Sequence, residues 1–142
     1  MATLTVTIQE SITLNGSERG STNTVDITCI EQLDQRIVKV GTVEQSLLLF
    51  DTAEAAGQFA DASVDYVRIT NLDSSNFVTL RMTSGDDEYF VKISAGDSFV
   101  LFETVMDTDD DSGAAVATLA NIDSIKAVAN SAACNVELFV AA

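Results

Sequence analysis

The acidic segment at residues 107–113 carries the side chains best suited to bind a metal ion. Asp107, Asp109 and Asp111 occupy alternate positions, as the first carboxylates of a calcium-binding loop do. Such a loop places glycine at its sixth position and glutamate at its twelfth, whereas this segment has Gly113 one position late and Thr118 in place of the glutamate. A solvated acidic loop explains the same residues, and no cofactor is predicted.

Catalytic chemistry has little support in the composition. The chain has no histidine, which removes the commonest general base and the commonest zinc ligand. Pairs of carboxylates could hydrolyse a glycoside, but 22 acidic residues in 142 bring some carboxylates together in any fold, and no tryptophan is present to stack on a sugar. We therefore predict that the protein is not an enzyme.

The charge of the chain limits its partners. A formal net charge of -15 repels phosphate, so neither nucleic acid nor an anionic membrane surface is an expected partner. The apolar clusters at residues 47–50 and 99–102 are much shorter than the roughly 20 residues that cross a bilayer. The N-terminus lacks the basic region of a signal peptide, so synthesis in a cytoplasm is expected.

Cys29 and Cys134 are the only cysteines. Two cysteines cannot build a disulfide framework, although a single bridge between them remains open. We predict two free thiols buried in the core.

Alternation between apolar and polar residues predicts strands along most of the chain. Leu4, Val6 and Ile8 share one face of a long N-terminal strand, which is expected to kink near Glu10 and Ser11. Further strands are predicted at about residues 24–30, 36–41, 45–50, 67–69, 78–82, 89–93, 99–102, 123–129 and 135–141.

One short helix is predicted at residues 51–62. Asp51 or Thr52 can cap its first turn, Glu54 suits the positive end of the helix dipole, and the alanines favour helix.

About ten strands in one chain of this length predict two packed sheets, because a single open sheet would leave an apolar face in water. We expect an all-β fold, a two-sheet antiparallel β-sandwich of the jelly-roll kind with one short helix, as a single domain over residues 1–142. The chain has no proline, so acidic side chains or another subunit must protect its sheet edges.

Four phenylalanines are candidate interface residues. Phe77, Phe90 and Phe139 are out of phase with the inward side chains of their strands, and Phe50 lies in a cluster that is apolar on both faces. Such residues form either a small core under a loop or a subunit interface.

The sequence of residues 65–80, which contains an Asn-Leu-Asp turn, resembles a pattern in small virion proteins of tailed bacteriophages. Residues 90–101, with an Ala-Gly-Asp turn before an apolar strand, extend the resemblance, and a final hairpin at residues 122–140 looks similar. Together these segments cover about half of the chain, and residues up to about 60 match no family.

The resemblance implies a capsid decoration (cement) protein that binds the major capsid protein on the virion surface as a homo-oligomer, often a trimer. A tail or neck adaptor, or a fibre-associated sandwich, is the alternative. A carbohydrate-binding module is a third interpretation. The composition disfavours it, because sugars stack on tryptophan and tyrosine rings and the chain has no tryptophan and only two tyrosines, Tyr66 and Tyr89.

Overall fold

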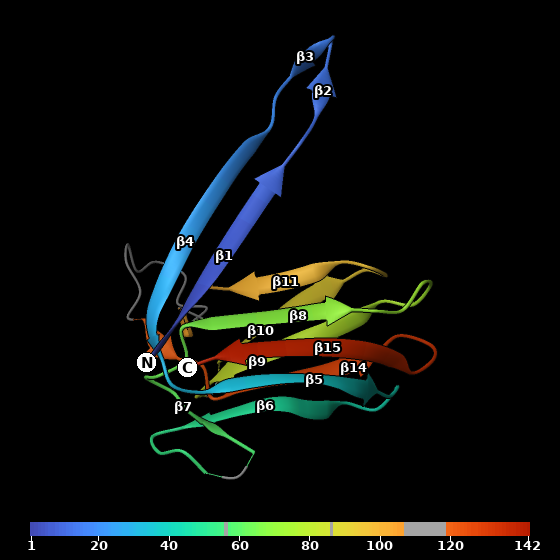
Figure 1. The fold of residues 1–142 in the computed structure, drawn as a ribbon. Helices are drawn as coiled ribbons and strands as arrows, with labels where there is room; N and C mark the ends of the chain where they lie inside the picture. The colour runs from blue at the N-terminus through green and yellow to red at the C-terminus, as the bar shows by residue number, and fades with distance from the viewer. Residues whose placement is uncertain (56, 86, 107–118) are drawn as a thin grey trace, which may run out of the picture. The chain divides into compact units, whose positions relative to one another are not determined.

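The computed structural model describes residues 1–55, 57–85, 87–106 and 119–142, and these residues form strands and no helix (Figure 1). The all-β prediction is therefore confirmed for this part of the chain. Within the same ranges there is no helix whose length and apolarity would allow it to cross a bilayer. Contacts divide the chain into two compact units, Met1–Gln32 and Leu33–Ala142, and the expectation of one domain stays a prediction.

The first unit is a long antiparallel hairpin. Its strands are β1 (Ala2–Glu10) and β4 (Ser21–Ile30), and its tip carries β2 (Thr13–Leu14) and β3 (Ser17–Glu18). Asn15 and Gly16 make the two-residue turn with φ of 51° and 76°, as a primed hairpin turn requires. β1 ends at Glu10 and β2 begins at Thr13, so the N-terminal strand is interrupted where the kink is predicted.

The second unit contains two larger sheets (Figure 1). The first follows the order β10-β9-β14-β6-β7, and the second follows the order β11-β8-β15-β5. The bounds are β5 (Leu33–Val40), β6 (Gln45–Asp51), β7 (Phe59–Ala60), β8 (Tyr66–Asn71), β9 (Val78–Ser84), β10 (Asp87–Ile93), β11 (Ser98–Leu101), β14 (Ser124–Ala129) and β15 (Cys134–Ala141). The short strands β12 (Val105–Met106) and β13 (Ala120–Asn121) form a separate pair.

The strands of the two larger sheets pair in a nested order. β5 pairs with β15, β6 with β14, β8 with β11, and β9 with β10, all antiparallel. β14 and β15 follow each other in the chain but belong to different sheets. The prediction of a hairpin at residues 122–140 is therefore wrong. The two strands alternate in polarity as a hairpin would, but each packs its apolar side against the core from a different sheet.

One hydrophobic core is shared by both sheets. Val78, Leu80 and Met82 of β9 have no exposed surface, and neither do Val136 and Leu138 of β15. The residues between them in each strand are partly exposed. Two mainly antiparallel sheets with inward faces on a common core are consistent with a β-sandwich.

The helix predicted at residues 51–62 is wrong for the described residues of that segment. Phe50 and Phe59 pair in parallel between β6 and β7, and both pack in or against the core. Gly57 has φ of 85°, outside the helical region, and the Asp61 amide donates to the Asp51 carbonyl at 2.7 Å. Burial of two aromatic rings outweighs the weak helix preference of the alanines.

Both cysteines are free thiols. Cys134 is buried on β15, as predicted, whereas Cys29 is exposed and the assignment of this residue to the core is wrong. Cys29 has φ of 69° at a β-bulge, where Thr3 pairs with Thr28 and Ala2 pairs with Ile30. The extra residue in the bulge turns its side chain away from the ladder.

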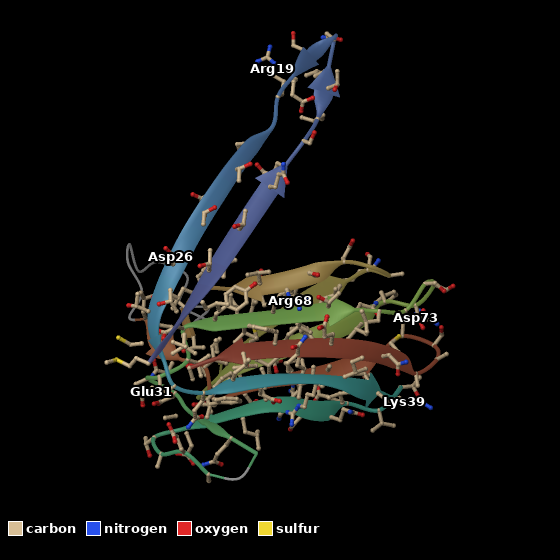
Figure 2. The ribbon with its side chains drawn as sticks, in the orientation of Figure 1. Arg19, Asp26, Glu31, Lys39, Arg68 and Asp73 are labelled. Carbon is tan, nitrogen blue, oxygen red and sulfur yellow. The ribbon has the colours of Figure 1, made fainter. Side chains whose placement is uncertain are left out.

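Asn71, at the end of β8, joins two turns from a fully buried position. Its Nδ2 donates to the carbonyl oxygens of Asn76 at 2.8 Å, Ser94 at 3.2 Å and Ile93 at 3.3 Å. Its Oδ1 accepts from the amide of Asp73, which lies in the turn after β8 (Figure 2). Asn71 thus satisfies the buried carbonyl of Ile93 and partly buried backbone groups of both turns.

We expect Asn71→Ala to lower the free energy of unfolding by about 2–3 kcal/mol, because the buried carbonyl of Ile93 and the partly buried carbonyls of Asn76 and Ser94 lose the Asn71 amide as a donor. Asn135→Ala is the control, since Asn135 is an exposed asparagine on β15, and a change within about 0.5 kcal/mol is expected there. Urea unfolding followed by circular dichroism measures both. Equal stability of the two variants would contradict a structural role for Asn71.

Candidate interaction surface

The four candidate phenylalanines do not share one surface. Phe50 lies in the core with 6% of its surface exposed. Phe90 is 54% exposed on the outward side of β10, and Phe77 is partly exposed just before β9. Phe139 is partly exposed on the outward side of β15, in the other sheet. The interface role of these residues stays a prediction, and it involves two different faces.

Asp107, Asp109 and Asp111 lie outside the described residues. Within the ranges that the structure does describe, no three His, Cys, Asp or Glu side chains gather as metal ligands would.

The outward side of the five-stranded sheet is dominated by paired charges. Arg81 lies between two carboxylates, with its Nη2 2.6 Å from Oε1 of Glu44 and its Nη1 3.0 Å from Oε2 of Glu88. The Lys92 ammonium sits 4.5 Å from the centre of the Phe77 ring. Arg81 is thus paired with two carboxylates and Lys92 with an aromatic ring, and Phe90 is the more exposed of the two phenylalanines on this side.

The outward side of the four-stranded sheet, named here the four-strand face, combines polar and apolar side chains. It is built by alternate residues of each strand, since neighbouring residues of a strand point to opposite sides of the sheet. Its members include Leu33, Gln35, Ile37 and Lys39 of β5, Asn135, Glu137 and Phe139 of β15, Arg68 and Thr70 of β8, and Ser98 and Val100 of β11.

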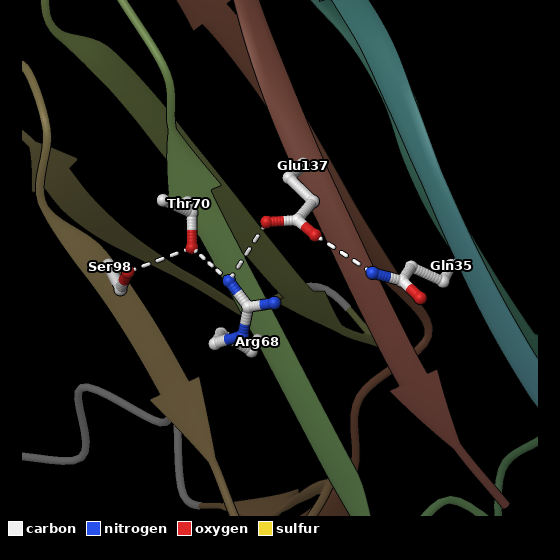
Figure 3. Close-up of polar contacts among 5 residues, drawn as sticks. All are labelled: Gln35, Arg68, Thr70, Ser98 and Glu137. Atoms are coloured by element: carbon white, nitrogen blue, oxygen red, sulfur yellow. Dashed lines mark hydrogen bonds and ion pairs between the residues drawn. The ribbon is translucent and has the colours of Figure 1, made fainter.

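A row of hydrogen bonds crosses all four strands of this face (Figure 3). Gln35 Nε2 donates to Oε1 of Glu137 at 3.0 Å, and Arg68 Nη1 donates to Oε2 of the same carboxylate at 3.2 Å. Arg68 also donates to Thr70 Oγ1, and the hydroxyls of Thr70 and Ser98 are 2.8 Å apart. Because each member is fixed by a neighbour on another strand, the row holds its geometry without a partner.

The pKa of Glu137 is lowered from its ordinary value of 4.5 by the hydrogen bonds that Arg68 and Gln35 donate to the charged carboxylate. Burial acts in the opposite direction and is the weaker effect. Arg68 and Glu137 are partly exposed, with 28% and 22% of their side-chain surfaces accessible. The pair is therefore ionised near neutral pH and remains open to a partner.

Aromatic rings cover one end of the face. Tyr66 packs edge-on against Phe102 and Phe139, with ring centres 5.4 Å and 6.0 Å away. The Arg68 guanidinium lies 5.9 Å from the centre of the Phe139 ring, within the range of a cation–π contact. Burial raises the pKa of Tyr66, and the nearby Arg68 charge partly opposes that effect. Tyr66 is thus too enclosed to stack on a sugar.

Two large apolar side chains on β5 stand open to solvent. Leu33 is 61% exposed and Ile37 is 64% exposed, although both belong to a strand of a folded sheet. β5 is also an edge strand among the described residues, where β15 is its one neighbour in that sheet. Exposed apolar groups beside a free strand edge favour contact with another protein.

The sequence indicated only part of this face. Arg68 and Thr70 are predicted to point outward, because they alternate with the apolar Val67 and Ile69. Glu137 of β15 is predicted to point outward for the same reason. The pairing of β8 with β15 and of β15 with β5 brings these side chains together. Nothing local to any one strand signals that pairing, so Phe139 is the one member of this face that the sequence predicts as an interface residue.

Comparison with protein-family models, with curated proteins and with solved structures gives no match to this chain. Its function therefore has to be inferred from the chemistry of the described surfaces.

Glu137→Gln should lower the free energy of unfolding by about 0.5–1 kcal/mol near pH 7, because it removes a partly exposed ion pair. A lowered pKa in the folded state means that the carboxylate stabilises the fold above pH 4.5 and that this contribution is lost as the pH falls through the lowered pKa. The deficit of the variant should therefore shrink on acidification.

Urea unfolding at several values from about pH 7 to about pH 2.5 measures this deficit. Glu103→Gln, at an exposed glutamate after β11, is the control for a change of net charge. A deficit that stays constant over the whole pH series would show that Arg68 and Gln35 do not stabilise the charged form of Glu137.

Proposed function

We propose that this chain is a virion structural protein, and most specifically a capsid decoration protein that binds the outer surface of a phage head. Its partner is then the major capsid protein, and it acts as a homo-oligomer on the virion. The observation that carries the proposal is the four-strand face, where exposed apolar side chains lie beside a polar row that is already ordered.

A jelly roll is the fold that we propose within the β-sandwich class. A jelly roll arises when a long antiparallel hairpin wraps around a core, so that the first of eight strands pairs with the last, the second with the seventh, and so on inward. The nested pairs β5 with β15, β6 with β14, β8 with β11 and β9 with β10 follow this rule. Viral capsid proteins are among the proteins that use this architecture.

The arrangement of the middle strands also supports the proposal. β8 ends at Asn71 in the Asn-Leu-Asp turn, and β9 follows it. β10 is followed by the turn at residues 95–97, where Gly96 has φ of 80°, and then by the apolar strand β11. This is the order of strands and turns that the resemblance to small phage virion proteins implies.

The four-strand face has the composition of a docking surface. Ile37 and Leu33 offer apolar area for burial, while Arg68 and Glu137 offer donors and acceptors in fixed positions. Protein interfaces combine an apolar centre with hydrogen-bonding groups around it. Because the polar row is ordered in advance, little side-chain freedom is lost when a partner binds.

The charge of the chain suits an outward position on a capsid. A net charge of -15 keeps free subunits soluble and repels packaged DNA.

We expect Ile37→Asp to weaken binding to expanded, undecorated capsids by at least about tenfold, because a carboxylate would be buried in an apolar contact. Val43→Asp is the matched control: it introduces the same carboxylate at an aliphatic residue that is 79% exposed in the turn after β5, outside the four-strand face. Co-sedimentation of purified protein with capsids, quantified over a concentration series, measures both affinities.

Failure of the unsubstituted protein to bind such capsids would overturn the proposed function. Equal binding by Ile37→Asp and Val43→Asp would show that the four-strand face is not the surface that binds the capsid. Immunogold labelling of particles locates the protein directly, and label on the tail or neck would replace the decoration role by that of an adaptor.

A further inference from the structure

The tip of the N-terminal hairpin contains the one Asn-Gly sequence of the chain. β2 and β3 form the tip, and Asn15 and Gly16 make the two-residue turn between them (Figure 1). Both turn residues are exposed. A Cβ atom added to Gly16 would meet no heavy atom within 4 Å, so the space around this part of the turn is open.

The side chain of Asn15 and the backbone amide of Gly16 are not held by other groups. Among the hydrogen bonds of the described residues, none involves either of them. The tip is fixed instead at Glu18, whose carboxylate accepts hydrogen bonds from residues 11–13. The turn itself is therefore left open to water and free to react.

An amide nitrogen that follows asparagine can attack the side-chain carbonyl carbon of that asparagine. A carbon–nitrogen bond forms and closes a five-membered imide, while the amide proton passes through water to the carboxamide nitrogen, which leaves as ammonia. Water then opens the imide at one of its two carbonyl carbons and yields either aspartate or isoaspartate. Glycine favours the first step because it has no Cβ atom to shield the attacking nitrogen.

We propose that Asn15 is a site of spontaneous deamidation, at which the Gly16 amide attacks the Asn15 side chain and converts position 15 into a mixture of aspartate and isoaspartate. Water is the only co-reactant. The inference concerns the hairpin alone and does not rest on the proposed capsid role.

The attack requires the turn to open, because the Asn15 side chain must fold back onto the next amide. β2 and β3 are joined by two residue pairs, whereas β1 and β4 are joined by nine. A short pair of strands opens more readily than a long one, so the tip can open while the rest of the hairpin stays paired.

The other six asparagines lack this combination of features. Asn71 is fully buried, and the side chains of Asn76 and Asn130 are held by hydrogen bonds. Each of the remaining three is followed by a β-branched residue, which shields the next amide: Asn23, Asn121 and Asn135. The hairpin tip is thus the one position where sequence and structure both favour the reaction.

The two products affect the tip differently. Aspartate is among the residues that accept a positive φ in a turn, so it keeps the turn and adds one negative charge. Isoaspartate routes the backbone through the side chain and adds one carbon atom to a two-residue turn. The two pairs between β2 and β3 then lose their register, while the pairing of β1 with β4 is retained.

Peptide mapping by mass spectrometry of the folded full chain, sampled during incubation in a mildly alkaline buffer, tests the proposal. We expect a gain of about 1 Da in the peptide that contains Asn15, before any other asparagine changes. An isoaspartate-specific methyltransferase should label the same peptide. The rate should rise with pH, because hydroxide deprotonates the attacking amide.

Gly16→Asp is the matched variant. Aspartate tolerates the positive φ of this position, but its side chain shields the backbone nitrogen, so deamidation of Asn15 should slow at least about tenfold. Circular dichroism checks that the variant keeps its strand content. Asn130, which is followed by the small Ser131, is the internal control and should stay unmodified over the same period.

Three results would overturn the proposal. The first is an Asn15 that stays intact in the folded chain after the same residue has been converted in chain unfolded by urea. The second is a Gly16→Asp variant that is modified at position 15 as fast as the unsubstituted protein. The third is earlier modification of another asparagine.

Discussion

The structure depends on one constraint: side chains on successive residues of a strand point to opposite faces, and one of these faces must be removed from water. In the second unit the constraint is met by two sheets that share a core, where Leu80 of β9 and Leu138 of β15 have no exposed surface. Once the inward residues are fixed, the outward ones are fixed as well. Arg68, Thr70 and Glu137 are brought into one row because their neighbours in the chain are committed to the core.

The same constraint has a different outcome in the N-terminal hairpin. Leu4, Val6 and Ile8 alternate with threonines as regularly as any core strand, yet the sheet that they belong to has two strands. Leu4 and Val6 are partly exposed, and Ile8 is 44% exposed. The same alternation thus accompanies a closed core in the second unit and a partly exposed apolar side in the first.

Most strands could be predicted because alternation is a local property of the chain. The Asn15-Gly16 turn, the break after Glu10 and the turn at Gly96 followed from residue types alone. The helix at residues 51–62 failed because its alanines favour helix only weakly, while Phe50 and Phe59 gain more from packing at the core. Cys29 was misplaced because a β-bulge shifts the alternation by one residue, and the bulge itself has no strong sequence signal.

The sequence by itself determined which side chains share a side in most strands, where most turns lie, and that the molecule carries a strong negative charge. Only the tertiary structure decided which strands are neighbours, and thus that Gln35, Glu137, Arg68, Thr70 and Ser98 form one row on one face. The physical reason is that alternation is set by the geometry of a single strand, whereas strand pairing is set by the burial of side chains that lie far apart in the chain.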